Sequence, residues 1–148
     1  MTTENTSTDE AKIRGLIEDR VKAVATKDLD AGMANHDPEV VMFDVVNPLR
    51  YSGTDAVRER TKAWFSLYDG AIGYEVRDLD VKVGGDAAFC HYLYRVSGTK
   101  TDGLKVEMWV RATLCFRKSA GEWVLAHEHD SVPFDPDSGR ASLDLEPD

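Results

Sequence analysis

The chain has 148 residues, with 27 acidic and 18 basic side chains, a net charge of −9, and 42% hydrophobic and 30% charged residues. This composition is typical of one globular domain, and the acidic balance argues against nucleic acid or an anionic membrane as a partner. The polar N-terminus "MTTENTSTDEAK" has no targeting pattern, and no apolar run approaches the roughly 20 residues of a spanning helix, so we expect a cytoplasmic protein.

The first part of the chain predicts three helices. Residues 1–8 are expected to be a disordered tail, and from Asp9 apolar residues recur at three- and four-residue steps, which indicates a helix. A short second helix, capped near Asp28, ends before a proline. A third helix begins at Thr54 or Asp55 and ends at the glycine-rich "DGAIG".

The rest of the chain predicts strands. The stretch "EVVMFDVV" forms the first, apolar except for Asp44. Short glycine-containing turns join the later strands, so we expect antiparallel pairing. These later strands are predicted at about Tyr74–Val83, Ala87–Val96, Lys105–Phe116 and Trp123–Asp130.

Helices followed by strands predict the α+β fold class, with three N-terminal helices packed on a curved, mostly antiparallel sheet. The pattern fills residues 9–135, which we expect to form a single domain, and the segment 136–148 is an acidic tail. Cys90 and Cys115 lie in apolar strands without metal or redox spacing, so we expect buried free thiols.

Three stretches resemble the SnoaL-like family of the nuclear transport factor two-like superfamily, which shares a cone-shaped fold with ketosteroid isomerase. They are "VVMFDVVNPLRYSGTDAVRE", "AAFCHYLYRVSGTKTDGLKVEMWVRATLCFRK" and "GEWVLAHEHDSVPFD". The last is also similar to the end of the calcium/calmodulin-dependent kinase association domain. The resemblance covers about residues 10–135 and implies a pocket and a homodimer. It does not fix the function, because this fold hosts isomerases, cyclases, dehydratases, hydrolases and assembly domains.

Asp44 is the first candidate catalytic residue. A carboxyl group within an apolar run suits a general base, and the resemblance places Asp44 on the general base of ketosteroid isomerase. The alternative is a strand-end acid bonded to the "NPLRY" loop. Other groups of that isomerase do not carry over, because its helix tyrosine falls near Arg20 and its neutral sheet acid near Ala112 or Thr113.

The strand before the last has one apolar face and one mixed face. The mixed face carries Glu107, Trp109, Arg111 and Thr113. Because tryptophan is a poor solvent residue, we expect this face to be buried in a cavity or a dimer seam. Arg111 is expected either to bind a carboxylate ligand or to form a structural ion pair with Glu107 or Glu128.

Four further residues are predicted to contact a ligand. Tyr92 and Tyr94 lie on one face of their strand and offer an apolar wall with hydroxyl groups. Trp64 on the third helix and His36 before the first strand are candidates for the same pocket. The alternative for each is ordinary core or interface packing.

The last strand places His127, Glu128, His129 and Asp130 in consecutive positions. By alternation the histidines face one way and the acids the other, and the resemblance puts Glu128 and Asp130 toward the cavity. A bulge would exchange the two sets, so the orientation stays open. No third ligand has a fixed relation to the histidine pair, so we expect no metal. His129 or Asp130 would relay a proton.

These features predict a cofactor-independent isomerase, cyclase or dehydratase that acts on a small hydrophobic carbonyl compound in an apolar pocket. Asp44 would be the base, and Arg111 with Tyr92 or Tyr94 would stabilise the developing negative charge. Nucleotide-binding, serine-hydrolase and dithiol motifs are absent from the sequence.

The alternative is a non-catalytic ligand-binding or assembly domain. Trp109 and His91 would then be interface residues, and Asp44→Asn would leave ligand affinity and oligomeric state almost unchanged.

Overall fold

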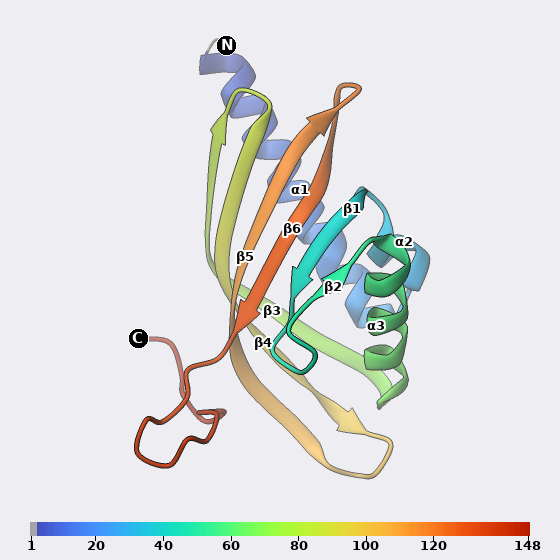
Figure 1. Cartoon of the computed structure of the whole chain (residues 1–148), viewed down its shortest axis with the longest axis vertical. Coiled ribbons are helices and arrows are strands. Elements are labelled where there is room, and N and C mark those ends of the chain that lie inside the picture. The colour runs from blue at the N-terminus through green and yellow to red at the C-terminus, as the bar shows by residue number, and fades with distance from the viewer. Residues whose placement is uncertain (1–2) are drawn as a thin grey trace.

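The computed structural model describes residues 3–148 of the chain, which contain three helices and six strands (Figure 1). The helices are α1 (Thr3–Thr26), α2 (Leu29–Met33) and α3 (Thr54–Ser66). The strands are β1 (His36–Phe43), β2 (Tyr51–Ser52), β3 (Tyr68–Gly84), β4 (Ala87–Lys100), β5 (Lys105–Ser119) and β6 (Glu122–Ser131). The α+β prediction is confirmed.

The strands form one sheet in the order β2-β1-β6-β5-β4-β3. All neighbouring strands are antiparallel except β1 and β6, which are parallel. These two strands are far apart in the chain, since β6 follows β3, β4 and β5. Figure 1 shows α1 lying along one face of this curved sheet, with α2 and α3 beside the β1–β2 edge. Helices on one face of a strongly bent sheet leave room for a cavity between the two layers.

Several boundaries differ from the prediction. The helix predicted from Asp9 begins at Thr3, so residues 3–8 are helical rather than a disordered tail, and residues 1 and 2 lie outside the described residues. The "DGAIG" stretch opens β3 instead of ending α3. Backbone pairing with β4, which reaches as far as Tyr68 opposite Lys100, outweighs the local glycine signal.

The core fills the space between α1 and the sheet. Ile13, Ile72, Cys90 and Leu114 have at most 1% of their surface exposed. Asp9 fastens the N-terminal half of α1 to the sheet, since its carboxylate accepts a hydrogen bond from Trp123 Nε1 at 3.0 Å and pairs with Lys118 Nζ at 3.0 Å. The helix is therefore held against the end of β5 and the beginning of β6 by both apolar contact and charge.

A β-bulge in β6 decides which of its side chains face inward. Leu125 pairs with Phe116 and His127 pairs with Cys115, so Ala126 is an extra residue on β6. Trp123 and Leu125 are buried before the bulge, and Glu128 and Asp130 are buried after it. The orientation that the sequence left open is thus resolved, with both acids inward.

The segment after β6 forms an exposed turn closed by a bridge between Phe134 and Ala141. Arg77 of β3 donates a hydrogen bond to the Asp148 carbonyl oxygen at 2.8 Å. Among the helices of residues 3–148, none combines the length and apolarity that a bilayer crossing requires.

Gly98 permits the close approach of β4 to the Tyr68 ring, and this contact yields a stability prediction. A Cβ at Gly98 would lie 2.9 Å from Tyr68 Cδ2 and 3.3 Å from the Ala71 oxygen. Gly98→Ala should therefore lower the free energy of unfolding by about 1–3 kcal/mol, measured by urea denaturation. Gly84→Ala is the control, because a Cβ there meets nothing within 4 Å. Equal effects of the two substitutions would contradict this account.

Candidate active site

A cavity of about 340 Å³ lies between the sheet, α1, α3 and the segment that follows β1. Its volume suits a small organic ligand. Most of its wall is apolar and includes Met42, Val57, Phe65, Met108 and Val110. The charged and titratable side chains on the wall are Arg20, His36, Asp44, Arg60, Tyr68, Tyr74, Tyr94, Lys100, Glu128 and Asp130.

On one wall of the cavity, Glu128 and Asp130 project from β6 beyond the bulge. Glu128 Oε1 accepts a hydrogen bond from Arg20 Nη1 of α1 at 2.8 Å, and only 8% of the Glu128 side chain is exposed. Asp130 Oδ2 accepts a hydrogen bond from the Tyr94 hydroxyl at 3.0 Å. The other oxygen, Oδ1, is buried and has no donor among the described residues.

This orphan oxygen is explained if Asp130 is protonated. Burial raises the pKa of Asp130 well above its usual range, and the negative charge of Glu128 raises it further. A protonated Oδ1 beside Glu128 is a donor rather than an acceptor, so it needs no donor of its own. For Glu128, burial favours a higher pKa, but Arg20 and the proton of Asp130 bring the pKa below its ordinary value. The pair is one neutral acid and one carboxylate.

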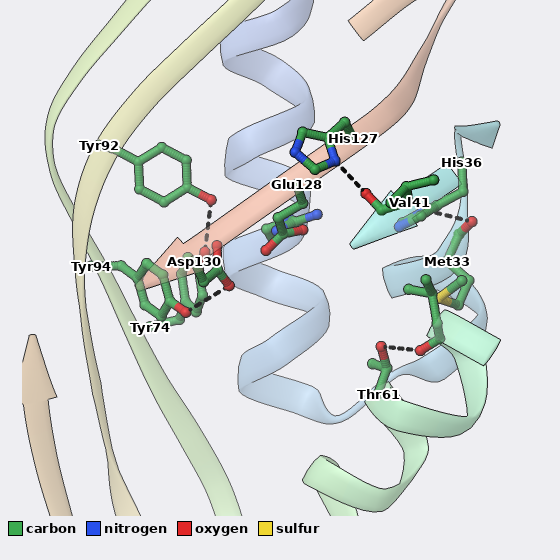
Figure 2. Close-up of polar contacts among 12 residues, drawn as sticks. Met33, His36, Val41, Thr61, Tyr74, Tyr92, Tyr94, His127, Glu128 and Asp130 are labelled. Atoms are coloured by element: carbon green, nitrogen blue, oxygen red, sulfur yellow. Dashed lines mark hydrogen bonds and ion pairs between the residues drawn. The ribbon is translucent and has the colours of Figure 1, made fainter. Parts of the chain in front are cut away.

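Three tyrosines from β3 and β4 surround Asp130, as Figure 2 shows. The rings of Tyr74 and Tyr94 stack with centroids 4.3 Å apart, and the hydroxyls of Tyr74 and Tyr92 share a hydrogen bond of 2.7 Å. Burial raises the pKa of all three hydroxyls, so they remain neutral hydrogen-bond donors at physiological pH. Tyr74 and Tyr94 line the cavity, whereas Tyr92 supports Tyr74 from behind this wall.

A second acid, Asp44, faces the cavity from the segment just after β1. Its Oδ2 accepts a hydrogen bond from Arg60 Nε of α3 at 2.6 Å, and its Oδ1 accepts one from the Val45 amide at 2.6 Å. Only 8% of the side chain is exposed. Asp44 is therefore a carboxylate held in an ion pair, and its charge contributes to raising the pKa of Asp130.

Two of the ligand-contact candidates from the sequence, His36 and Trp64, also line the cavity. His36 Nδ1 lies 3.0 Å from the Met33 carbonyl oxygen, which fixes the ring (Figure 2). Burial and the nearby charge of Arg20 lower the pKa of His36, so it is neutral at physiological pH.

The structure does not bring Arg111, His129, Trp109 or Thr113 to the cavity, because all four lie on the opposite face of the sheet. Arg111 is exposed and donates from Nε to Ser131 Oγ at 3.1 Å, rather than pairing with Glu107 or Glu128. His129 is exposed, with its ring centroid 5.4 Å from that of Phe43. Strand alternation is the reason, since the residues of β5 that line the cavity are Val106, Met108 and Val110.

Two arginines complete the site and were not singled out from the sequence as site residues. Arg20 lies on the inward stripe of α1 between Ile17 and Val24, and Arg60 lies on that of α3 beside Val57. A cation on the apolar stripe of a helix is the sequence signal that could have identified both.

A second hollow, of about 380 Å³, lies between α1, α2 and the sheet. Its lining includes Arg20 and His36 but neither Asp44 nor Asp130, so it lacks the two acids of the first cavity. Within residues 3–148, no three His, Cys, Asp or Glu side chains are grouped as ligands of one metal ion.

The sequence pattern of the SnoaL-like domain family matches residues 13–135. The chain is similar to the crystal structure of an NTF2-like protein of unknown function from Pseudomonas putida KT2440. The two share 31% identity with a TM-score of 0.88, over 95% of this chain and 98% of that one. A search of curated proteins finds no significant match.

Two more distant structures share the fold. A ketosteroid isomerase-like protein from Erwinia carotovora atroseptica SCRI1043 has a TM-score of 0.71 at 22% identity, over 83% of this chain and 95% of that one. A protein assigned as a calcium/calmodulin dependent protein kinase II association domain, from Xanthomonas campestris, has a TM-score of 0.72 at 16% identity, over 90% and 88%.

The neutral state of Asp130 can be tested by the pH dependence of stability. Above the ordinary aspartate pKa the unfolded chain releases this proton while the folded chain keeps it, so stability is lost as pH rises. Asp130→Asn removes this loss, because its amide can donate to Glu128 and accept from Tyr94. We expect the free energy of unfolding of the variant, relative to the original, to increase from about pH 4 upward, by at most about 1.4 kcal/mol per pH unit.

The matched control is Asp86→Asn, in the exposed turn between β3 and β4. Its difference from the original protein should be flat with pH. A flat difference for Asp130→Asn as well would mean that Asp130 is ionised in the folded protein.

Proposed function

We propose that this chain, which belongs to the SnoaL-like domain family, is a cofactor-independent isomerase, cyclase or dehydratase that moves a proton on a small hydrophobic carbonyl compound. The proposal rests on one observation. A single apolar cavity holds two carboxyl groups in opposite states, the ion-paired carboxylate of Asp44 and the neutral acid of Asp130. Asp44 follows the β1 residue that pairs with His129, so the two acids lie on neighbouring strands of the sheet. Two acids with opposed protonation states in one cavity are what general acid–base catalysis requires.

Asp44 is the proposed base. One of its oxygens takes a proton from the carbon next to the substrate carbonyl, and the C–H electron pair moves into the carbonyl to form an enolate. Arg60 Nε and the Val45 amide hold the carboxylate in position for this transfer. The base is thus fixed by two donors from different segments, which limits the reorganisation needed before reaction.

Asp130 is the proposed acid. Its proton, which burial and the charge of Glu128 keep in place, forms a hydrogen bond to the developing enolate oxygen. Tyr94 donates to the other oxygen of Asp130 and keeps the acid oriented. The proton on Asp44 then returns to another carbon in an isomerisation. In a dehydration, Asp130 instead protonates the leaving hydroxyl, which departs as water. Arg111 and His129 have no part in this scheme, because they lie on the other face of the sheet.

The outer face of the sheet supports a second proposal, a homodimer. This face carries the half-buried Trp109 and Cys115, and Phe89, which pairs with Cys115 across the strands, is 44% exposed. Aromatic side chains that a monomer leaves partly exposed on the outer face of a sheet are typical of interfaces.

Proton transfer can be tested with ketones that have exchangeable hydrogens, such as 2-tetralone and substituted acetophenones. We expect the protein to accelerate deuterium incorporation next to the carbonyl in D₂O, followed by NMR. Asp44→Asn should slow this exchange by about 10²–10⁴-fold, because the base is removed. Asp30→Asn is the control, since Asp30 also pairs with an arginine of α3, Arg58, at 2.6 Å, but is exposed.

Binding of these ketones is measured separately by calorimetry. Ligands that bind without exchange, with the same affinity for the original protein and Asp44→Asn, would overturn the enzyme proposal. That outcome would instead favour the non-catalytic ligand-binding alternative.

For the homodimer, light scattering should give twice the mass of one chain. Phe89→Glu should give a single-chain mass, because it places a charge within the proposed interface. Lys62→Glu on α3 is the charge-changing control and should remain dimeric. A single-chain mass for the original protein would refute the assembly.

A further inference from the structure

Lys100, the last residue of β4, directs its side chain into the cavity. It pairs with Tyr68 across the β3–β4 ladder, and directly opposite residues of an antiparallel pair share one face of the sheet. The Tyr68 side chain is buried on the inner face, with 6% of the residue exposed. The side chain of Lys100 lies on this same face and forms part of the cavity wall.

Lys100 is a half-buried cation without a carboxylate partner. None of the ion pairs among residues 6–148 includes it, although the chain has 27 acidic side chains. The nearest acid in sequence, Asp102, accepts a hydrogen bond from the Leu104 amide in the exposed hairpin turn. An ammonium group that is partly withdrawn from water and unpaired favours an anion beside it.

Arg60 supplies further donors at the same end of the cavity. Its guanidinium bonds to Asp44 through Nε, and neither Nη group donates to another described residue. Arg60 and Tyr68 both line the cavity, and the positive charge of Arg60 partly offsets the rise that burial causes in the pKa of Tyr68. A third cation, Lys27, donates from Nζ to the Tyr68 carbonyl oxygen at 2.9 Å. Positive charge therefore gathers around Tyr68.

The charges that line the cavity do not cancel. Arg20 is matched by Glu128 and Arg60 by Asp44, and Asp130 and His36 are neutral. Lys100 is left over, so the wall carries one net positive charge inside a chain with a net charge of −9. A ligand with a single negative charge would neutralise it.

We propose that the substrate carries a carboxylate, which binds between Lys100 Nζ and the free Nη groups of Arg60. This assignment rests on the proposed function for the position of the reacting carbonyl, between Asp44 and Asp130. Arginine offers a planar pair of donors that matches a carboxylate, and lysine adds a point charge.

The position of Arg60 also constrains the ligand. Its Nε bonds to Asp44, so a carboxylate held by the Nη groups of the same guanidinium lies close to the base. The wall near Lys100 is apolar and includes Val96, Val106 and Met108. The substrate is therefore a compact keto acid, whose carboxylate and reacting carbon both lie near Arg60.

The test uses acetophenones that carry an alkyl carboxylic acid of increasing chain length at the para position, each paired with its primary amide. Calorimetry should show that the acid binds about ten- to a hundredfold more tightly than its amide at the best chain length. Lys100→Met should abolish this preference. Lys100→Arg keeps the positive charge and should retain the preference, which shows that a substitution at this position leaves the protein folded. Lys105→Met, in the same hairpin but exposed, is the matched control and should retain it too.

The outcomes separate this inference from the proposed function. Equal affinity of acid and amide, or a preference that survives Lys100→Met, would overturn the carboxylate site even if deuterium exchange is catalysed. A preference lost in Lys100→Met, without any exchange, would retain the carboxylate site and overturn the enzyme proposal. Tighter binding of a phosphonate than of the matching carboxylate would contradict the single-charge argument.

Discussion

The buried ion pair between Arg20 and Glu128 is the interaction on which this cavity depends. The bulge at Ala126 turns Glu128 inward, and an unpaired carboxylate in the interior would cost several kcal/mol. Arg20 of α1 removes this cost, and in doing so it joins the helix layer to the last strand at 2.8 Å. With Glu128 kept charged, Asp130 cannot also ionise beside it, so it keeps its proton. The contact between α1 and β6 thus sets the charge states of both Glu128 and Asp130.

Asp44 and Asp130 differ because their neighbours differ. Asp44 accepts hydrogen bonds from a cation and from a backbone amide. Asp130 is buried beside the Glu128 carboxylate, and both its burial and this charge raise its pKa. The apolar wall strengthens the effect of Glu128, since charges interact more strongly away from water. The sequence supplies two aspartates, and the fold pairs one with a cation and buries the other beside a carboxylate.

The fold was largely predictable because it depends on local patterns. Helical periodicity and the glycine turns located every helix and long strand, and the family resemblance supplied the topology, including the curvature of the sheet. The start of α1 and the start of β3 were wrong, since long-range packing and pairing extend elements beyond their local signals.

The site was less predictable, because it depends on which face of each strand lies inward. Asp44, Asp130 and Tyr94 were anticipated, whereas Arg111 and His129 were assigned to a cavity that lies behind them. Simple alternation does not say which face is inside, and a single-residue bulge changes the answer within one strand. Arg20 and Arg60 were missed since their partners are distant in sequence. Glu128 follows Arg20 by 108 residues.

Arg60 lies between the proposed carboxylate site and the base, and this gives substrate binding a chemical consequence. In the free protein its guanidinium pairs with Asp44 through Nε. A carboxylate that binds to the Nη groups would share the same positive charge, and the interaction of Arg60 with Asp44 Oδ2 would weaken. A carboxylate with less stabilisation from a cation is a stronger base. Binding of the carboxylate of the substrate would therefore activate the base, so that binding energy is converted into reactivity.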